Sequence, residues 1–324
     1  MVGEAISTGG TDTLGAVRAL IVTNMYPSRE HPALGSFVRD QVEALRRIPA
    51  VQLELFAFAP GGAGAYVRAA SKLRRLHGRT RFDVVHAHFG LTAWPALAAR
   101  TRARAVTLHG TDLAHPRSRI LTLGALPFLD LVAAVSEPML EQVPRWMKRG
   151  QTEVLPAGVD IARFRPIPRG EARRRLGLRP DGPYLLFAAD PARAEKRHDR
   201  ALAAAGDVPL LSLGNVQPEQ VPLWVNAANA VLVPSEREGF GLAVLEALAC
   251  DVPVLATPVG IACSVLDGIP GTYCGPFDVA AWRAVLQAHV SSADPRVHGR
   301  ARAESFSTDR MAARVVAAWR ALGA

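Results

Sequence analysis

Short apolar segments rich in β-branched residues alternate with stretches of helical spacing along most of the chain. The apolar segments predict strands at residues 17–23, 51–59, 83–88, 105–109, 131–136, 184–188, 210–213, 230–234 and 252–256. Residues 37–47 and 308–322 instead carry their apolar side chains along one helix face. Strands that alternate with helices indicate an α/β fold with parallel sheets.

A stretch rich in Pro, Gly and Arg at residues 156–183 interrupts the series and predicts a connection between two domains. We expect a loose polar tail at 1–16, an N-terminal domain at 17–165, a C-terminal domain at 166–307 and a last helical segment at 308–324. Each domain is predicted to be a doubly wound parallel sheet. Ligands of such sheets bind beyond the carboxyl ends of the strands, so polar residues at those ends are the first site candidates.

The composition is that of an ordinary globular enzyme, with 324 residues of which 49% are hydrophobic and 21% charged. It excludes a wholly disordered chain and a small disulfide-stapled module. No apolar run reaches the roughly 18–20 residues of a membrane-spanning helix, and residues 1–15 lack the features of a secretory signal. The three cysteines, Cys250, Cys263 and Cys274, have neither zinc nor disulfide-framework spacing. We therefore expect a reduced, cytoplasmic protein in which all three are small apolar fillers.

The net charge of +9 points to an anionic partner or substrate. Only 6% of the residues are aromatic and no stretch interleaves them with Arg, so we expect no nucleic-acid partner. The run from Tyr66 to Arg81 holds six Lys or Arg residues and no acid. Its apolar residues could share one helix face: Tyr66, Val67, Ala70, Leu73 and Leu76. Such a helix either lies on an anionic membrane or docks on its own sheet.

After the strand predicted at 230–234, the segment SEREGFGLAVLEALA at residues 235–249 places Glu238 in a glycine-containing turn and Glu246 in an apolar helix. Glycines in the turn let the backbone approach a ligand, and the helix N-terminus offers free N–H groups to a phosphate. Glu246, in an otherwise apolar helix, is suited to accept hydrogen bonds from two ribose hydroxyls. The alternative is a capping carboxylate followed by a solvated helix glutamate. The candidate binding residues are Glu238, Gly239, Phe240, Gly241, Leu242 and Glu246.

Two cations follow the strand predicted at 184–188, in the segment AADPARAEKR. Arg193 and Lys196 can clamp a diphosphate there and stabilise the negative charge that develops as it leaves. The alternative is a pair of solvated loop cations.

Histidines mark the ends of two strands in the N-terminal half. In the segment HGTD, His109 can bond a sugar hydroxyl or a phosphate, with Asp112 beside it, or can cap the next helix. His86 and His88 are two residues apart on a strand and could face one way. No third ligand stands at a suitable spacing, so no metal is expected. After the first strand, Gly35 opens a helix whose backbone N–H groups can face a diphosphate.

These motifs resemble glycosyltransferase family 4. The two glutamates that enclose Gly-Phe-Gly match the signature of its retaining enzymes, and further similar segments lie between residues 17 and 260. These segments are residues 24–41, 83–90, 109–112, 154–166, 188–197 and 222–229. Two departures are a closer Arg–Lys spacing without the usual Gly-Arg opening, and Ala157 in place of a commoner Asn. The likeness is greatest to enzymes of bacterial cell-surface polysaccharides of the teichuronic acid type.

The resemblance implies the GT-B fold, in which two Rossmann-like domains face each other and the last helix packs back on the first domain. It implies hexosyl transfer from a nucleotide diphosphate sugar, such as a UDP-sugar, to an acceptor hydroxyl with anomeric retention, without metal or cofactor. The implied catalytic residues are His109, Arg193, Lys196 and Glu238. Implied donor contacts are Gly35, Arg193, Lys196, Glu238, Gly239, Phe240, Gly241, Leu242 and Glu246, with His88 and Asp112 on the acceptor side.

Two other function classes stay open on the sequence alone. One is a GT-B sugar-nucleotide-binding protein without transfer activity. The other is a GT-B epimerase or phosphorylase, in which Asp112 near His109 would be the second acid or base. The acceptor would be a sugar, a lipid-linked molecule or a small metabolite, and the product a polysaccharide, a glycolipid or a secondary-metabolite glycoside. We expect a location in the cytoplasm, with peripheral contact to the inner membrane face through residues 66–81.

Overall fold

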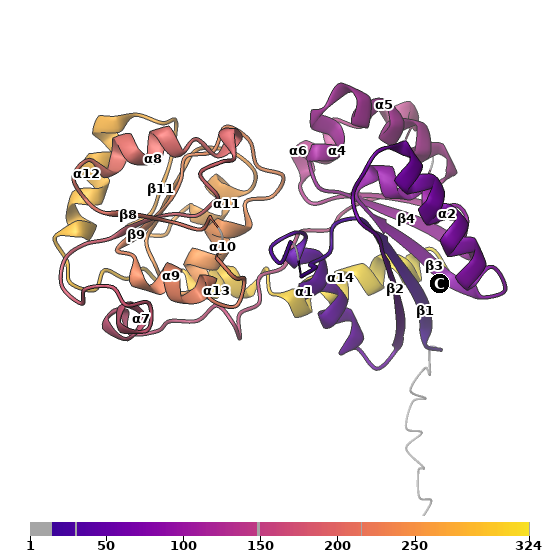
Figure 1. The fold of residues 1–324 in the computed structure, drawn as a ribbon, viewed down its shortest axis with the longest axis horizontal. Helices are drawn as coiled ribbons and strands as arrows, with labels where there is room; N and C mark the ends of the chain where they lie inside the picture. Colours follow the sequence, from indigo (N-terminus) through magenta and orange to yellow (C-terminus); the bar gives the residue numbers. More distant parts are fainter. Residues whose placement is uncertain (1–14, 30, 148–149, 215, 324) are drawn as a thin grey trace, which may run out of the picture.

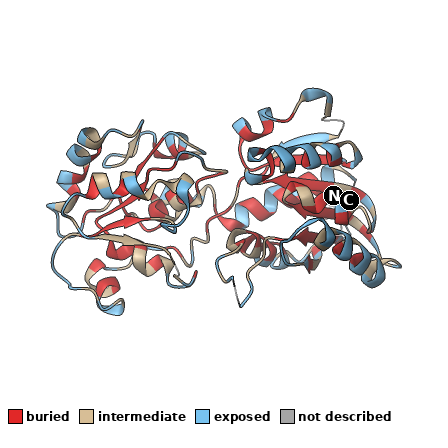
Figure 2. Cartoon of the chain, turned by 45° about the horizontal axis from the view of Figure 1, so that its top comes forward, coloured by how far each residue is buried: buried red, intermediate tan, exposed pale blue. Residues whose placement is uncertain are grey.

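The computed structural model describes residues 15–29, 31–147, 150–214 and 216–323 (Figure 1). In this part the chain forms two parallel sheets, one of six strands in the order β2-β1-β3-β4-β5-β6 and one of five in the order β11-β10-β9-β7-β8. Helices cover both sheets, and in Figure 2 the buried strands lie between helices whose outer faces are exposed. The predicted fold class, two doubly wound α/β domains, is confirmed.

The strands of the first sheet are β1 Val17–Thr23, β2 Val51–Ala57, β3 Arg81–His88, β4 Arg100–Leu108, β5 Leu131–Ala134 and β6 Gln151–Val154. Those of the second are β7 Leu185–Phe187, β8 Leu210–Ser212, β9 Ala230–Val233, β10 Val254–Ala256 and β11 Tyr273–Cys274. The α-helices of the first half are α1 Ser36–Arg46, α2 Ala63–His77, α3 Ala93–Ala96, α4 Thr111–Ala114, α5 Pro116–Ala125 and α6 Glu137–Glu141. Those of the second half are α7 Arg169–Arg175, α8 His198–Ala205, α9 Val221–Ala227, α10 Leu242–Ala249, α11 Ala262–Leu266, α12 Val279–Val290, α13 Arg300–Glu304 and α14 Thr308–Ala321.

The last helix, α14, returns to the N-terminal domain and completes its core. Trp319 has no exposed surface and packs with Val38 and Leu45 of α1. A parallel bridge joins Val159, in the connection that leads into the second domain, to Ser307, directly before α14. Figure 1 shows α14 beneath the first sheet, next to α1. The chain therefore crosses between the domains twice, at neighbouring points.

Helix α2 docks through a different face from the one the sequence analysis proposed. Ala69 and Leu73 are buried, whereas Val67 and Leu76 are exposed at 66% and 58% of their surface. The helix ends at His77, so the last arginines of the basic run lie beyond it. Ala69 and Leu73 are four residues apart and so share one face, and the helix packs against α3. The prediction of one apolar face that includes Val67 and Leu76 is wrong.

The prediction for the cysteines is also wrong in part. Cys263 at the start of α11 and Cys274 on β11 form a disulfide, with their Cα atoms 5.2 Å apart. Their side chains meet because the turn after α11 folds the chain back, which a spacing of eleven residues does not reveal. Cys250 is buried and free, and burial raises the pKa of its thiol to about 12, so it is the expected apolar filler. No helix in the described residues has the length and apolar content to cross a membrane.

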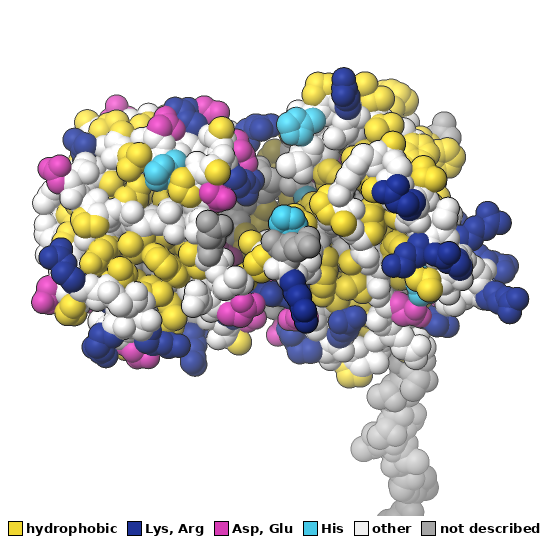
Figure 3. Space-filling model, viewed as in Figure 1, with side chains coloured by type: hydrophobic (Ala, Val, Ile, Leu, Met, Phe, Trp, Pro, Cys, Tyr) yellow, Lys and Arg dark blue, Asp and Glu magenta, His cyan; other side chains and the backbone are white. Residues whose placement is uncertain are grey.

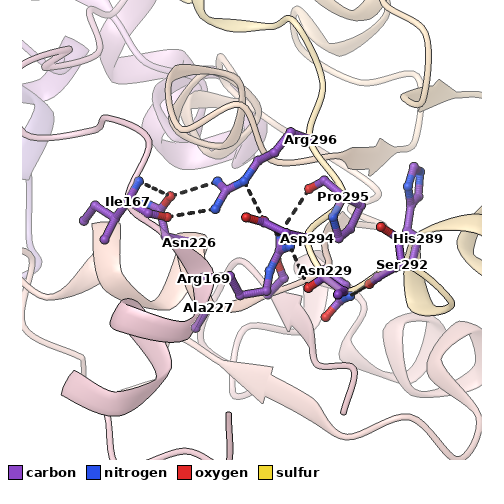
Figure 4. Close-up of polar contacts among 12 residues, drawn as sticks. Ile167, Arg169, Asn226, Ala227, Asn229, His289, Ser292, Asp294, Pro295 and Arg296 are labelled. Atoms are coloured by element: carbon purple, nitrogen blue, oxygen red, sulfur yellow. Dashed lines mark hydrogen bonds and ion pairs between the residues drawn. The ribbon is translucent and has the colours of Figure 1, made fainter. Parts of the chain in front are cut away.

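A buried arginine ties the interdomain connection to the second domain (Figure 4). Arg169, at the start of α7, is 2% exposed and donates to the carbonyl oxygens of Ala228 and Pro295. It also forms an ion pair with Asp294. Burial lowers the pKa of its guanidinium to about 10, so it stays charged at neutral pH.

A second arginine, Arg296, continues this network on the other side. It donates to the side-chain oxygen of Asn226 at 3.1 Å and to the carbonyl of Ile167 at 2.8 Å. Asn226 in turn accepts from the Ile167 N–H at 2.9 Å. The segment entering the second domain is therefore fixed by side chains from α9 and from the loop after α12.

Replacing Arg169 by leucine should destabilise the second domain by about 3 kcal/mol, because buried carbonyl groups lose their donor. Chemical denaturation followed by circular dichroism measures the change. The matched control is Arg174→Leu on the same helix, where the side chain is exposed and the expected change is below about 0.5 kcal/mol. Equal losses in the two variants would contradict the role of the network.

Candidate functional site

The two domains touch through backbone at the carboxyl ends of their sheets. Gly239, in the loop after β9, lies so close to the loop after β4 that a Cβ atom on it would be 2.1 Å from the carbonyl oxygen of His109. Gly110, at φ +113°, would place a Cβ atom 3.0 Å from the Gly239 Cα. Only glycine fits such an approach at a positive φ. The Ser136 hydroxyl adds a hydrogen bond across the domains to the Gly239 carbonyl at 3.4 Å.

Glu238 and Lys196 form an ion pair beside this contact. The Lys196 ammonium donates to one carboxylate oxygen of Glu238 at 2.6 Å, and the Ser235 hydroxyl donates to the other at 2.7 Å. The two charged side chains are only 12% and 11% exposed, so water screens them weakly. This ion pair joins the loop after β7, which carries Lys196, to the loop after β9, which carries Glu238.

Arg193 lies apart from Lys196, at the rim. Its side chain is 54% exposed and pairs with Glu195 at 2.6 Å. The carbonyl of Glu195 accepts the N–H of Glu236 at 2.9 Å, which is a second link between the two loops. In this structure the two predicted clamp cations therefore do not converge, and Lys196 alone points to Glu238.

The loop that leads into α10 presents the helix N-terminus. Gly241 precedes the helix at φ +100°, and among the described residues no side chain caps it. The buried Phe240 anchors the loop, because its carbonyl accepts the Ile261 N–H at 2.9 Å. Gly260 makes this possible, since a Cβ atom there would lie 2.2 Å from the same carbonyl. Uncapped N–H groups and the helix dipole suit this end of α10 to an anion. On the first domain, Gly35 opens α1 at φ +65°.

Glu246 of α10 is half-buried and has no hydrogen-bond partner among the described residues. Burial raises the pKa of its carboxyl to about 7, Arg163 opposes this rise, and Asp40 adds to it. Arg163 is itself held by Asp40 of α1 at 2.6 Å. Sequence reasoning missed Asp40 and Arg163, because only the fold brings α1 and the interdomain connection to α10. A partly desolvated carboxylate without a partner is suited to accept hydroxyl groups from a ligand.

A stack of histidines leads from α14 to the site. The Trp319 indole N–H donates to Nδ1 of His86 at 3.0 Å, and Nε2 of His86 lies 2.8 Å from the Thr107 hydroxyl. Because an indole can only donate, the proton of the neutral His86 ring sits on Nε2. His86 stacks on His88 with ring centres 4.9 Å apart, which confirms that the two face one way.

His88 carries the stack to His109, since its Nδ1 lies 3.1 Å from His109 Nε2. His88 has no exposed surface, so it supports His109 from inside the domain and is not itself accessible to a ligand, contrary to its predicted place on the acceptor side. Burial lowers the pKa of all three rings, that of His88 to about 4. His109 is thus a neutral hydrogen-bonding group at neutral pH. Among the described residues no three His, Cys, Asp or Glu side chains gather as a metal site.

Asp112 organises the loop in front of His109. Its carboxylate has no exposed surface and accepts the backbone N–H groups of His109 at 3.0 Å, Gly110 at 2.7 Å and Gly90 at 3.1 Å. Burial raises the pKa of Asp112 and these N–H groups lower it. With its oxygens engaged, Asp112 positions the loop and is not available as an acid or base.

Comparison with known proteins gives two matches to family models. Residues 18–163 match the model described as Glycosyltransferase Family 4, and residues 183–291 match the one described as Glycosyl transferases group 1. A D-inositol 3-phosphate glycosyltransferase of Geodermatophilus obscurus is 28% identical over 321 residues, covering 81% of this chain and 71% of that protein. The enzyme of the same name from Pseudarthrobacter chlorophenolicus is 27% identical, with 89% and 81% coverage.

Solved structures share the fold at low identity. Sucrose-phosphate synthase from Thermosynechococcus elongatus superposes with a TM-score of 0.74 and 20% identity, over 95% of this chain and 99% of that one. Anabaena HepE, in complex with UDP and glucose, gives a TM-score of 0.70 at 15% identity, over 94% and 100%.

Replacing Glu246 by glutamine should stabilise the protein at pH 8 and leave its stability nearly unchanged at pH 4. The folded-state pKa of about 7 lies above the unfolded value of about 4.3. Between these two values the folded state binds more protons than the unfolded state. The stability of the wild type therefore falls as the pH rises through this range. We expect a gain on the order of 1 kcal/mol at pH 8, measured by chemical denaturation. Glu141→Gln, at an exposed position, is the control, and a gain independent of pH would contradict the assignment.

Proposed function

The chain belongs to the GT-B glycosyltransferases of the family 4 and group 1 type, and on this basis we propose that it moves a hexosyl unit from a nucleotide diphosphate sugar to an acceptor hydroxyl with anomeric retention. The observation that supports the donor side best is Glu246. Among the residues the structure describes, this half-buried carboxylate has no partner, and it lies on α10, whose N-terminus after Gly241 no described side chain caps. Glu246 would accept the ribose hydroxyls, and the N–H groups of the loop and helix would bind phosphate and sugar.

In the proposed reaction, the bond between the sugar C1 and the diphosphate oxygen breaks, and the diphosphate leaves with the electron pair. The acceptor oxygen bonds to C1 on the same face, and its proton passes to the leaving phosphate. Lys196 would stabilise the departing charge by exchanging Glu238 for the diphosphate, which frees Glu238 for a sugar hydroxyl. Arg193 is exposed and can turn inward on its long side chain. His109, held by His88, would bond the donor sugar. We propose that these groups act without a metal cofactor.

The names of the relatives suggest which substrates to try first. UDP-glucose is the ligand named for a HepE structure, and inositol 3-phosphate is named in the curated relatives. We propose a UDP-sugar as the donor. A role in cell-surface polysaccharide or glycolipid synthesis, at the inner membrane face, is the corresponding proposal for the acceptor. The epimerase alternative loses its second acid or base, since Asp112 is engaged by backbone N–H groups.

Donor affinity should fall as the pH drops below about 7, because protonated Glu246 cannot accept two hydroxyls. Because a single carboxyl titrates, the donor affinity can fall by at most about tenfold per pH unit. Calorimetry with UDP-glucose and other nucleotide sugars between pH 5.5 and 8.5 measures the affinity. The phosphate groups of nucleotide sugars do not titrate in this range, so a change in affinity reports on the protein. Glu246→Gln should bind weakly at every pH, and Glu141→Gln should behave as wild type. If no nucleotide sugar binds at any pH, the donor proposal fails; if one binds but no acceptor is glycosylated, the binding-protein alternative holds.

Gly239→Ala should abolish most transfer while leaving each domain folded. The added methyl group would meet the His109 carbonyl at 2.1 Å, so the domains must separate at the site. A displacement of about 1 Å costs on the order of 100-fold in rate. The measurement is kcat/KM with the donor that calorimetry identifies, alongside the melting temperature. Gly170→Ala, where a Cβ atom meets nothing closer than 3.6 Å, is the control. Full activity in Gly239→Ala would contradict the importance of the contact.

A further inference from the structure

A hollow of about 610 Å³ opens on the N-terminal domain, at the amino ends of β3 and β4. Four arginines line it: Arg74 from α2, Arg81 and Arg100 from the first positions of β3 and β4, and Arg104 from further along β4. Arg81 and Arg100 are direct neighbours in the register of the two strands. The proposed transferase site lies at the carboxyl ends of the same strands, so the hollow is separate from it.

The four guanidinium groups have no anionic partner in the described residues. No carboxylate is part of the lining, and none of the four side chains forms an ion pair or a hydrogen bond there. The nearby acids are engaged by backbone, since Asp130 accepts the N–H of Arg104 at 2.8 Å. Nε of Arg104 is buried without a partner. Buried donors without a partner are costly, so this one marks a place for an acceptor.

The surroundings increase the attraction for an anion. Figure 3 shows Lys and Arg side chains gathered on the edge of the N-terminal domain farthest from the second domain. Arg68, Lys72 and Arg75 of α2 belong to the same basic run as Arg74. Like charges that converge on one hollow repel each other, and a bound anion would relieve this repulsion. The volume is in the range of about 300–1,000 Å³ that small-molecule sites occupy.

We propose that this hollow, the arginine pocket, binds a phosphate group. Planar guanidinium groups match phosphate oxygens in bidentate fashion, which ammonium groups or a diffuse positive field do not. A phosphate monoester brings two negative charges and three acceptor oxygens to such a site. The group would come either from a lipid headgroup or from a phosphate in solution. The proposal does not depend on glycosyl transfer, since no residue of the transferase site takes part.

The test compares two double variants that each remove two positive charges. Arg100→Gln with Arg104→Gln changes the lining, whereas Arg75→Gln with Arg102→Gln changes exposed arginines of α2 and β4 outside it. One arm titrates inorganic phosphate by calorimetry at constant ionic strength. The other sediments the protein with phosphatidylcholine vesicles that carry phosphatidic acid, with phosphatidylglycerol vesicles as a diester control. The melting temperature verifies that every variant is folded.

We expect the pocket variant to bind its ligand at least about tenfold more weakly than the control variant, a difference of about 1.4 kcal/mol. Binding in the phosphate arm identifies a dissolved ligand, and binding only to phosphatidic acid vesicles identifies a headgroup. The proposal is overturned if wild type binds neither, or if the two variants lose affinity equally, since the latter would be a general charge effect. It is also overturned if the pocket variant binds as wild type does, because phosphate would then occupy another site.

Discussion

The buried hydrogen bond from Trp319 to His86 connects the end of the chain to the centre of the first domain. A buried imidazole needs partners for its nitrogens, and the last helix supplies one that no element of the first domain provides. The core around α1 is therefore completed by a helix that follows the second domain in the sequence. Two crossings that run side by side, joined by the bridge between Val159 and Ser307, leave the domains one hinge region rather than free rotation. The position of the second domain relative to the first depends on this double connection.

The contact between the two domains follows from that constraint. With the hinge fixed, the loops after β4 and β9 meet backbone to backbone, and Gly110 and Gly239 are the residues that allow it. The same loops carry His109 and Glu238, so the contact between the domains also brings these two residues into the same region. His109 contacts His88, which stacks on His86. Glu238 accepts hydrogen bonds from Lys196 and Ser235. His109 and Glu238 are thus each held by neighbouring side chains of their own domain.

The sequence predicted what depends on local pattern and failed where distant segments meet. Residues 17–23 form β1 with the predicted limits, because a buried central strand is mostly apolar, and only Arg18 near its start is exposed. β6 and β11 escaped prediction, since the first is polar and the second has two residues. His88 and His109 could be found because they lie at or directly after the end of a strand, and Glu238 and Glu246 because they enclose a glycine-containing turn before an apolar helix. Asp40 and Arg163 lie within segments that resemble the family, but they reach Glu246 only through the domain arrangement, which the sequence does not reveal. The disulfide between Cys263 and Cys274 likewise depends on a turn that their spacing does not specify.

The raised pKa of Glu246 means that its ionised form is destabilised in the folded protein, and a ligand could relieve this. The ionised carboxylate is less stable there than in water, because burial removes solvent and Arg163 compensates only in part, while it is itself bound to Asp40. A neutral glutamine would fold more easily at this position. The cost is recovered when two hydroxyl groups donate to the carboxylate, since they replace the missing water and bring its pKa down. A ligand without such hydroxyls would leave the charge unsolvated. The same burial that destabilises the ionised carboxylate would therefore favour a ligand with two such hydroxyls, as the proposed ribose contact requires, and the pairing of Asp40 with Arg163 would influence how strongly.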